Sequence, residues 1–133
     1  MFKVGDRVWN KKKKCLDTVQ EVMYESYVLK SDIRFTVGEQ DLHQTAQTMF
    51  EALGYEEDYI PYYCGHKENK GKLLLSRTPY ENDERKEIIM FNLYSKDYQT
   101  YGISGTALHI DNDLHLAIHQ KLIELGYLEW KSN

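Results

Sequence analysis

The sequence predicts an α+β protein, with a small β-barrel in residues 1–43 and, in residues 44–133, an antiparallel sheet flanked by two helices. In the first part, short runs of apolar and β-branched residues are separated by turn residues, as in small all-β units. In the second part, two segments repeat apolar residues at helical spacing, and strand-like runs lie between them. This order indicates that both helices pack on one face of an antiparallel sheet.

Four strands and a closing segment are expected in residues 1–43. The first strand surrounds the pair Gly5-Asp6, and the polar run 10–14 forms the turn that follows it. The remaining strands are expected at residues 19–23, 27–30 and 33–37, before Asp41-Leu42-His43 closes the segment.

The first helix is expected from four apolar residues that share one helical face: Ala46, Met49, Phe50 and Leu53. Thr45 is a suitable N-cap, and Gly54 stands where a left-handed residue ends a helix. The second helix is expected over residues 112–125, with Asp111 as N-cap and Gly126 as terminator. Strands are expected between them at residues 59–64, 72–76, 87–94 and 99–103, with a short last one at 108–110 and a loop at 78–86.

Composition narrows the class of protein. Apolar residues make up 41% and charged residues 29% of the chain, as in a globular protein. The formal net charge of -4 argues against a nucleic-acid binder, which usually carries a basic excess.

No apolar run is long enough for a bilayer, and the N-terminus lacks the pattern of a signal peptide. Cys15 and Cys64 form neither a metal spacing nor a disulfide framework, so we expect a cytoplasmic protein.

The N-terminal part resembles the SH3-like and Tudor-like small barrels. The matching residues are Val4-Gly5-Asp6-Arg7-Val8 at the start and Glu39-Gln40-Asp41-Leu42 at the end. The resemblance implies a binding module, because such barrels bind peptides, methylated side chains, RNA or other protein domains. The aromatic residues here do not have a spacing that defines a cage for a methylated side chain: Trp9, Tyr24, Tyr27 and Phe35.

Residues 45–128 resemble small proteins of phages and prophages from low-GC Gram-positive bacteria. The resemblance lies in a helix that ends in Leu-Gly-Tyr, an Ile-Ile-x-Phe strand, and the closing helix from Leu114 to Tyr127. It implies an accessory protein in the cytoplasm of a bacterial host, where such proteins bind host components that include defence machinery.

Tyrosines provide the first candidate site. The chain has eleven tyrosines against four phenylalanines, and tyrosine is enriched at protein interfaces. If the helices cover one sheet face, strand alternation leaves several tyrosines on the other face, beside an acidic loop. The candidate partner-binding residues are Tyr59, Tyr62, Tyr63, Tyr94, Tyr98, Tyr101, Glu81, Asp83 and Glu84.

The only basic cluster is a lysine run in the predicted barrel. Together with Arg7, it provides an alternative site for phosphates of a nucleic acid or nucleotide: Lys11, Lys12, Lys13 and Lys14. The competing interpretation is a solvated hairpin turn that protects a strand edge.

The second helix is apolar over more of its circumference than one sheet face requires. Its additional residues are a candidate homodimer interface, with packing against the barrel of the same chain as the alternative: His115, Leu116, His119 and Ile123. The two histidines lie four apart, but no third ligand accompanies them, so no metal is predicted.

No arrangement typical of catalysis is found. Cys64 and His66 share a strand face, but no third residue orients them, and no glycine-rich phosphate loop is present. Together with the resemblance to phage and prophage proteins, this absence predicts a non-enzymatic accessory protein without a cofactor that binds a host protein. Inhibition of host defence is one form of such binding that the resemblance implies. The alternative is a nucleic-acid or nucleotide-binding protein that uses the barrel and its lysine run.

Overall fold

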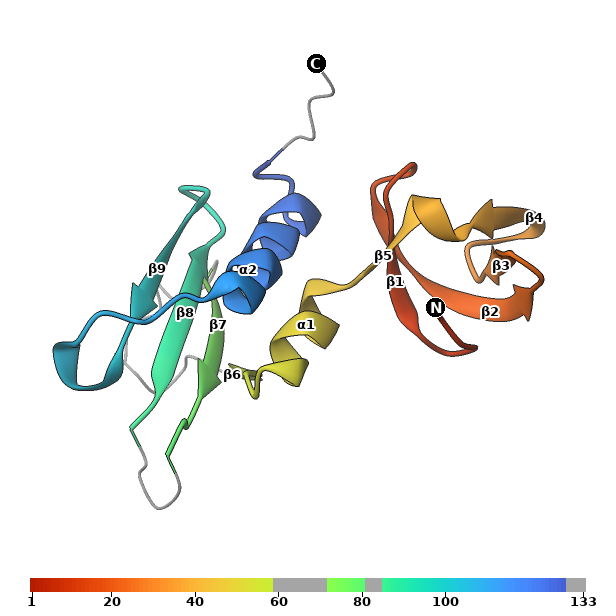
Figure 1. The fold of residues 1–133 in the computed structure, drawn as a ribbon. Coiled ribbons are helices and arrows are strands. Elements are labelled where there is room, and N and C mark those ends of the chain that lie inside the picture. Colours follow the sequence, from red (N-terminus) through yellow and green to blue (C-terminus); the bar gives the residue numbers. More distant parts are fainter. Residues whose placement is uncertain (59–71, 81–84, 129–133) are drawn as a thin grey trace.

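The computed structural model describes residues 1–58, 72–80 and 85–128. They form two antiparallel sheets and two α-helices, which confirms the α+β class (Figure 1). The N-terminal sheet contains β1 (Arg7–Asn10), β2 (Cys15–Met23), β3 (Ser26–Leu29), β4 (Asp32–Gly38) and β5 (Leu42–Gln44), with the 3-10 turn η1 (Glu39–Asp41) before β5. The C-terminal sheet contains β6 (Glu56–Asp58), β7 (Lys72–Arg77), β8 (Glu87–Asn92) and β9 (Asp97–Tyr101). The helices are α1 (Ala46–Ala52) and α2 (Asn112–Glu124), and a second 3-10 turn, η3 (Ile103–Gly105), follows β9.

The N-terminal sheet has the strand order β4-β3-β2-β1-β5, with antiparallel neighbours throughout. Register shifts between Val19 and Glu21 and between Val28 and Leu29 bend it, as bulges do. The bend encloses a small core of Val8, Val19, Tyr27, Leu29 and Leu42. Within residues 1–58, however, no pairing joins β4 to β5, so the sheet is curved but not a closed barrel.

The C-terminal sheet is a meander with the order β6-β7-β8-β9. Leu75 pairs with Ile89, and Leu73 pairs with Phe91, so these side chains share one face. Both helices cover that face, as predicted (Figure 1). The resulting core joins residues of α1, α2, β7 and β8 with two from the connecting segments: Ala46, Phe50, Tyr55, Leu75, Ile89, Phe91, Leu108, Leu114, Ala117 and Ile118.

The helix ends agree with the sequence prediction. The Thr45 side chain accepts a hydrogen bond from the backbone N–H of Thr48 at 3.2 Å, and Asp111 accepts one from Leu114 at 2.9 Å. Gly54 and Gly126 have φ values of +87° and +78°, which favour glycine. Local capping chemistry therefore determines where both helices begin and end.

Two strand predictions in the C-terminal part have different outcomes. Residues 108–110 form no strand, because Leu108 packs into the helix-covered core instead of pairing with β9. The strand predicted at 59–64, which contains Cys64, lies outside the described residues, as do residues 81–84 of the predicted loop.

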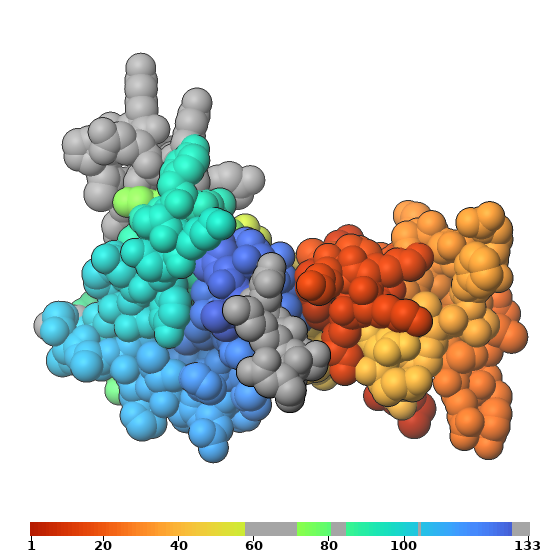
Figure 2. Space-filling view, turned by 90° about the horizontal axis from the view of Figure 1, so that it is seen from above, coloured from red at the N-terminus to blue at the C-terminus, as the bar shows by residue number. Residues whose placement is uncertain are grey.

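The two sheets lie at opposite ends of the molecule, with the helices between them (Figures 1 and 2). β5 leads into α1 through the single residue Thr45, so Leu42 belongs to one core and Ala46 to the other. Neither described helix is long and apolar enough to cross a membrane.

Candidate functional site

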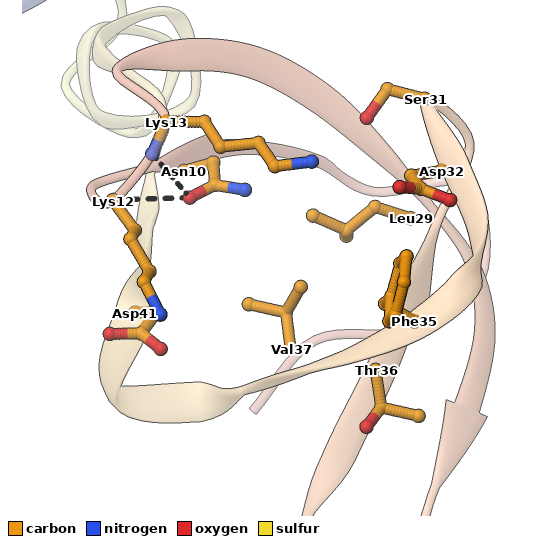
Figure 3. Close-up of a pocket in the computed structure, with 10 residues that line it drawn as sticks. All are labelled: Asn10, Lys12, Lys13, Leu29, Ser31, Asp32, Phe35, Thr36, Val37 and Asp41. Carbon is orange, nitrogen blue, oxygen red and sulfur yellow. Dashed lines mark hydrogen bonds between the residues drawn. The ribbon is translucent and has the colours of Figure 1, made fainter.

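The N-terminal sheet contains a hollow of about 440 Å³, here called the N-terminal hollow (Figure 3). The ends of β1 and β3, the β1–β2 turn, the β3–β4 turn, β4 and η1 converge on it. The lining residues are Asn10, Lys12, Lys13, Leu29, Ser31, Asp32, Phe35, Thr36, Val37 and Asp41. Its volume lies in the range of about 300–1,000 Å³ that is typical of ligand sites.

A shaped lysine turn forms one wall of the hollow. The side-chain oxygen of buried Asn10 accepts hydrogen bonds from the backbone N–H groups of Lys12 and Lys13, both at 3.1 Å. Lys11 donates its backbone N–H to the Asp41 carbonyl at 2.8 Å, and Lys14 adopts a φ of 53°. The turn therefore has a defined shape and directs the Lys12 and Lys13 side chains to the hollow (Figure 3).

A buried carboxylate holds the opposite wall. Asp17 of β2 accepts hydrogen bonds from the backbone N–H groups of Thr18 and Ser31, at 2.9 and 3.1 Å, and also from the Ser31 hydroxyl. These bonds tie the β3–β4 turn to β2. Because Ser31 and Asp32 line the hollow, Asp17 determines the position of this wall without being part of the lining.

Asp32 is the charged residue of that wall. Its carboxylate accepts a hydrogen bond from the Arg34 side chain at 3.2 Å, and this bond is the main cause of a lowered pKa for Asp32. The positive charge of Lys13 lowers the same pKa further, because Lys13 and Asp32 line the same hollow. The hollow thus presents charges of both signs at neutral pH.

The remaining lining is apolar. Leu29 is buried and Val37 half-buried, whereas Phe35 is 64% exposed. The Arg34 guanidinium lies 5.5 Å from the centre of the Phe35 ring. An exposed aromatic ring beside a concave surface indicates a binding site more strongly than a buried ring does, because its exposed surface can contact a ligand.

The aromatic residues of the N-terminal part do not gather into a cage. Trp9 and Tyr27 are 6% and 4% exposed, whereas Tyr24 is 91% exposed in the β2–β3 turn. Only Phe35 among these four residues lines the hollow.

The fold does not bring the residues of the predicted lysine site together in one place. Lys12 and Lys13 line the hollow, while Lys11 and Lys14 are exposed on the same turn and are not among the lining residues. Arg7 lies at the opposite end of β1 from this turn, so it does not join the lysines.

The predicted tyrosine surface is described only in part. Tyr98 pairs with Phe91 and contacts its ring at 5.8 Å, so it lies on the helix-covered side of the sheet. Tyr101 lies on the other side, and Tyr94 is 79% exposed in the β8–β9 turn. The three described tyrosines thus do not share one sheet face. The remaining residues of this candidate site lie outside the described ranges: Tyr59, Tyr62, Tyr63, Glu81, Asp83 and Glu84.

The candidate interface on α2 forms one stripe of the helix. The rings of His115 and His119 stack with centres 6.4 Å apart, and Leu116 beside them is 52% exposed. Ile123 is half-buried one turn further on. The N-terminal sheet therefore leaves this part of α2 uncovered. In the described ranges, no three His, Cys, Asp or Glu residues are arranged to hold a metal ion.

Sequence reasoning missed most of the hollow. A local signal existed for Asn10, because an asparagine before a polar run typically forms a side-chain-to-backbone turn. No local signal marks Leu29, Ser31 or Val37, since their role depends on how β4 pairs with β3.

Charge is also divided unevenly along the chain. Residues 1–45 contain eight lysines and arginines against seven acidic residues, whereas residues 46–133 contain nine against fourteen. The acidic excess of the protein therefore belongs to the C-terminal part, and the hollow lies in the part that is close to neutral.

The chain matches no family model, no curated protein and no solved structure.

Proposed function

We propose that this chain is a non-enzymatic accessory protein of the kind that phages and prophages carry, and that it binds a host protein in the bacterial cytoplasm. The N-terminal hollow is the observation that carries the proposal. It combines an exposed aromatic ring, an apolar floor and charges of both signs, which is the chemistry of protein recognition. Inhibition of a host defence protein is one form that such binding takes.

The strand order of the N-terminal sheet supports the comparison with SH3-like small barrels. Five short antiparallel strands, with a single 3-10 turn before the last, suit a module that displays a binding surface between its turns. The resemblance of residues 45–128 to phage and prophage proteins supports the cellular setting.

Two further surfaces belong to the proposal. The exposed tyrosines of the β8–β9 hairpin provide two further contacts for the partner, Tyr94 in the turn and Tyr101 at the far end of β9. The stripe around His115 and Leu116 on α2 provides a surface for a second copy of the chain, because an exposed leucine beside stacked imidazoles suits the rim of an interface.

Nucleic-acid binding is the second candidate function. Lys12 and Lys13 line the same hollow as the exposed Phe35 ring, and lysines with an aromatic ring are typical of single-strand binding. Against this, Asp32 and Asp41 line the same hollow and balance the two lysines, whereas a nucleic acid requires an excess of positive charge for its row of phosphates. We therefore place protein binding first.

A pull-down from a Gram-positive host lysate, with and without nuclease, tests the proposal. We expect the wild-type protein to retain a host protein after nuclease treatment, and the variant Lys12→Gln/Lys13→Gln/Phe35→Ala to lose it. The control Lys3→Gln/Lys30→Gln removes two exposed lysines of the same part outside the hollow and should retain the partner. Retention that disappears with nuclease and falls steeply with salt would favour the nucleic-acid function.

A further inference from the structure

We infer that the N-terminal hollow binds an extended segment of the partner protein in which an apolar side chain stands next to an acidic one. This inference rests on the proposed function and specifies the chemistry of the partner.

The apolar floor requires an apolar side chain. Leu29 and Val37 form the base of the hollow, and the Phe35 ring stands at its side with most of its surface exposed (Figure 3). A hollow of about 440 Å³ holds a few neighbouring side chains rather than a folded domain. The ligand part that enters is therefore a short segment of chain.

The charge arrangement selects an acidic neighbour. The Lys13 side chain extends across the opening, and the Lys12 side chain extends toward Asp41 (Figure 3). The Asp32 carboxylate is bound by Arg34 at 3.2 Å, and no ion pair in the described part of the chain joins it to Lys13. Lys13 is thus positioned to bind a ligand carboxylate, and the Asn10 bonds hold its backbone in place.

The edge of the sheet favours a peptide over a nucleic acid. β4 pairs with β3 and, within residues 1–58, with no other strand. An extended peptide adds to such an edge through its backbone, whereas a nucleic acid cannot. A peptide also supplies N–H donors to Asp32 and Asp41 and a single carboxylate to Lys13, whereas a nucleic acid would bring a row of phosphates to a hollow whose charges balance.

Selection from a displayed library of random dodecapeptides on the immobilised full-length protein tests this inference. We expect enrichment of sequences with Asp or Glu next to a large apolar residue. Fluorescence anisotropy with the most enriched peptide should give a Kd at least tenfold weaker for Lys12→Gln/Lys13→Gln and for Phe35→Ala. Both substitutions change exposed side chains, and circular dichroism and thermal unfolding check that the variants stay folded.

The charge-reversal variant Lys13→Glu provides the sharpest comparison, because a merely structural role of Lys13 would not alter which charges the selected peptides carry. Selection on this variant should favour basic residues at the positions where wild type selects acidic ones. The inference is wrong if selection on the wild type enriches basic or uncharged peptides. It is equally wrong if the peptides selected on the wild type and on Lys13→Glu carry the same charge. It is also wrong if a dT20 oligonucleotide competes with the peptide at the hollow.

A failure of the proposed function and a failure of this inference would give different results. Acidic peptides that bind the hollow without any host protein in the pull-down would contradict the proposed function and support the inference. A host protein whose retention depends on the hollow, together with selected peptides that lack acidic residues, would contradict the inference alone.

Discussion

Tyr55 places a hydroxyl inside the C-terminal core. Its ring packs against Phe50 with centres 5.8 Å apart, and the Arg77 guanidinium lies 4.7 Å from the ring centre. Among the described residues, no group forms a hydrogen bond with the buried hydroxyl. Burial raises the pKa of Tyr55 to about 12, so the phenol stays protonated in the folded protein.

The substitution Tyr55→Phe should leave the free energy of unfolding at pH 7 unchanged or raise it by up to about 1 kcal/mol, because it removes an unsatisfied buried donor. In the wild type, stability should fall as pH rises from the ordinary tyrosine pKa of 10.0 toward about 12, because the unfolded chain ionises first. The Tyr55→Phe variant should lose less stability between pH 10 and 12. Urea unfolding at pH 7, 9 and 10.5 measures both effects.

Tyr24→Phe is the control, because Tyr24 is 91% exposed. This substitution should change neither the free energy of unfolding at pH 7 nor its dependence on pH. A variant destabilised by more than about 1 kcal/mol at pH 7 would indicate that the Tyr55 hydroxyl has a partner after all.

At the scale of elements, α1 depends on its neighbours. It has seven residues, which is too short for a helix to be stable in isolation. At its N-terminus, the Glu124 carboxylate of α2 accepts a hydrogen bond from the Ala46 N–H at 2.6 Å. At its C-terminus, Arg77 of β7 donates to the Leu53 carbonyl at 3.0 Å while also binding Glu87 at 3.0 Å. Side chains from two other elements therefore hold the two ends of α1.

Replacing Glu124 with alanine should lower the free energy of unfolding by about 1–2 kcal/mol, because the Ala46 N–H and the Gln120 side chain both lose an acceptor. Urea unfolding measures the loss, and hydrogen exchange should show faster exchange of the α1 amides. Glu51→Ala is the matched control, since its exposed carboxylate bonds only to Gln47 among the described residues. Equal losses for the two variants would contradict the role given to Glu124.

At the scale of the whole molecule, two separate cores meet at one short junction. Leu29 is buried in the N-terminal core, and Ile118 is buried in the C-terminal core. The two clusters share no residue, and Thr45 alone separates β5 from α1. The two parts are therefore expected to open as distinct units in the native state.

The substitution Leu29→Ala should cost about 2–4 kcal/mol in the N-terminal part. Native-state hydrogen exchange should then show faster exchange of the amides of β1 to β5, with little change in β7 and β8. Ile118→Ala, the corresponding change in the other core, should give the reverse pattern. Equal acceleration in both parts for either variant would indicate one cooperative unit.

Much of the secondary structure follows from local sequence. Thr45 and Asp111 cap the helices as predicted, and Gly54 and Gly126 end them, because each of these roles depends on neighbouring backbone groups only. The packing of both helices on one sheet face was predicted for a related reason, since apolar periodicity identifies the face that must be buried.

The candidate sites followed from the sequence less well. Tyr98 and Tyr101 are close in sequence and similar in chemistry, yet strand alternation places them on opposite faces. The lysine run was recognised, but its turn turned out to be one wall of a hollow whose other wall lies on the β3–β4 turn.

Residue spacing and short-range hydrogen bonds were enough to predict the α+β class, the caps of the two helices and the lysine turn. That the N-terminal sheet stays open and that Lys13, Asp32 and Phe35 surround one hollow followed from the folded arrangement of the strands and could not be predicted. The reason is that strand register and bulges bring together residues that are distant along the chain, and no local pattern encodes which strands pair.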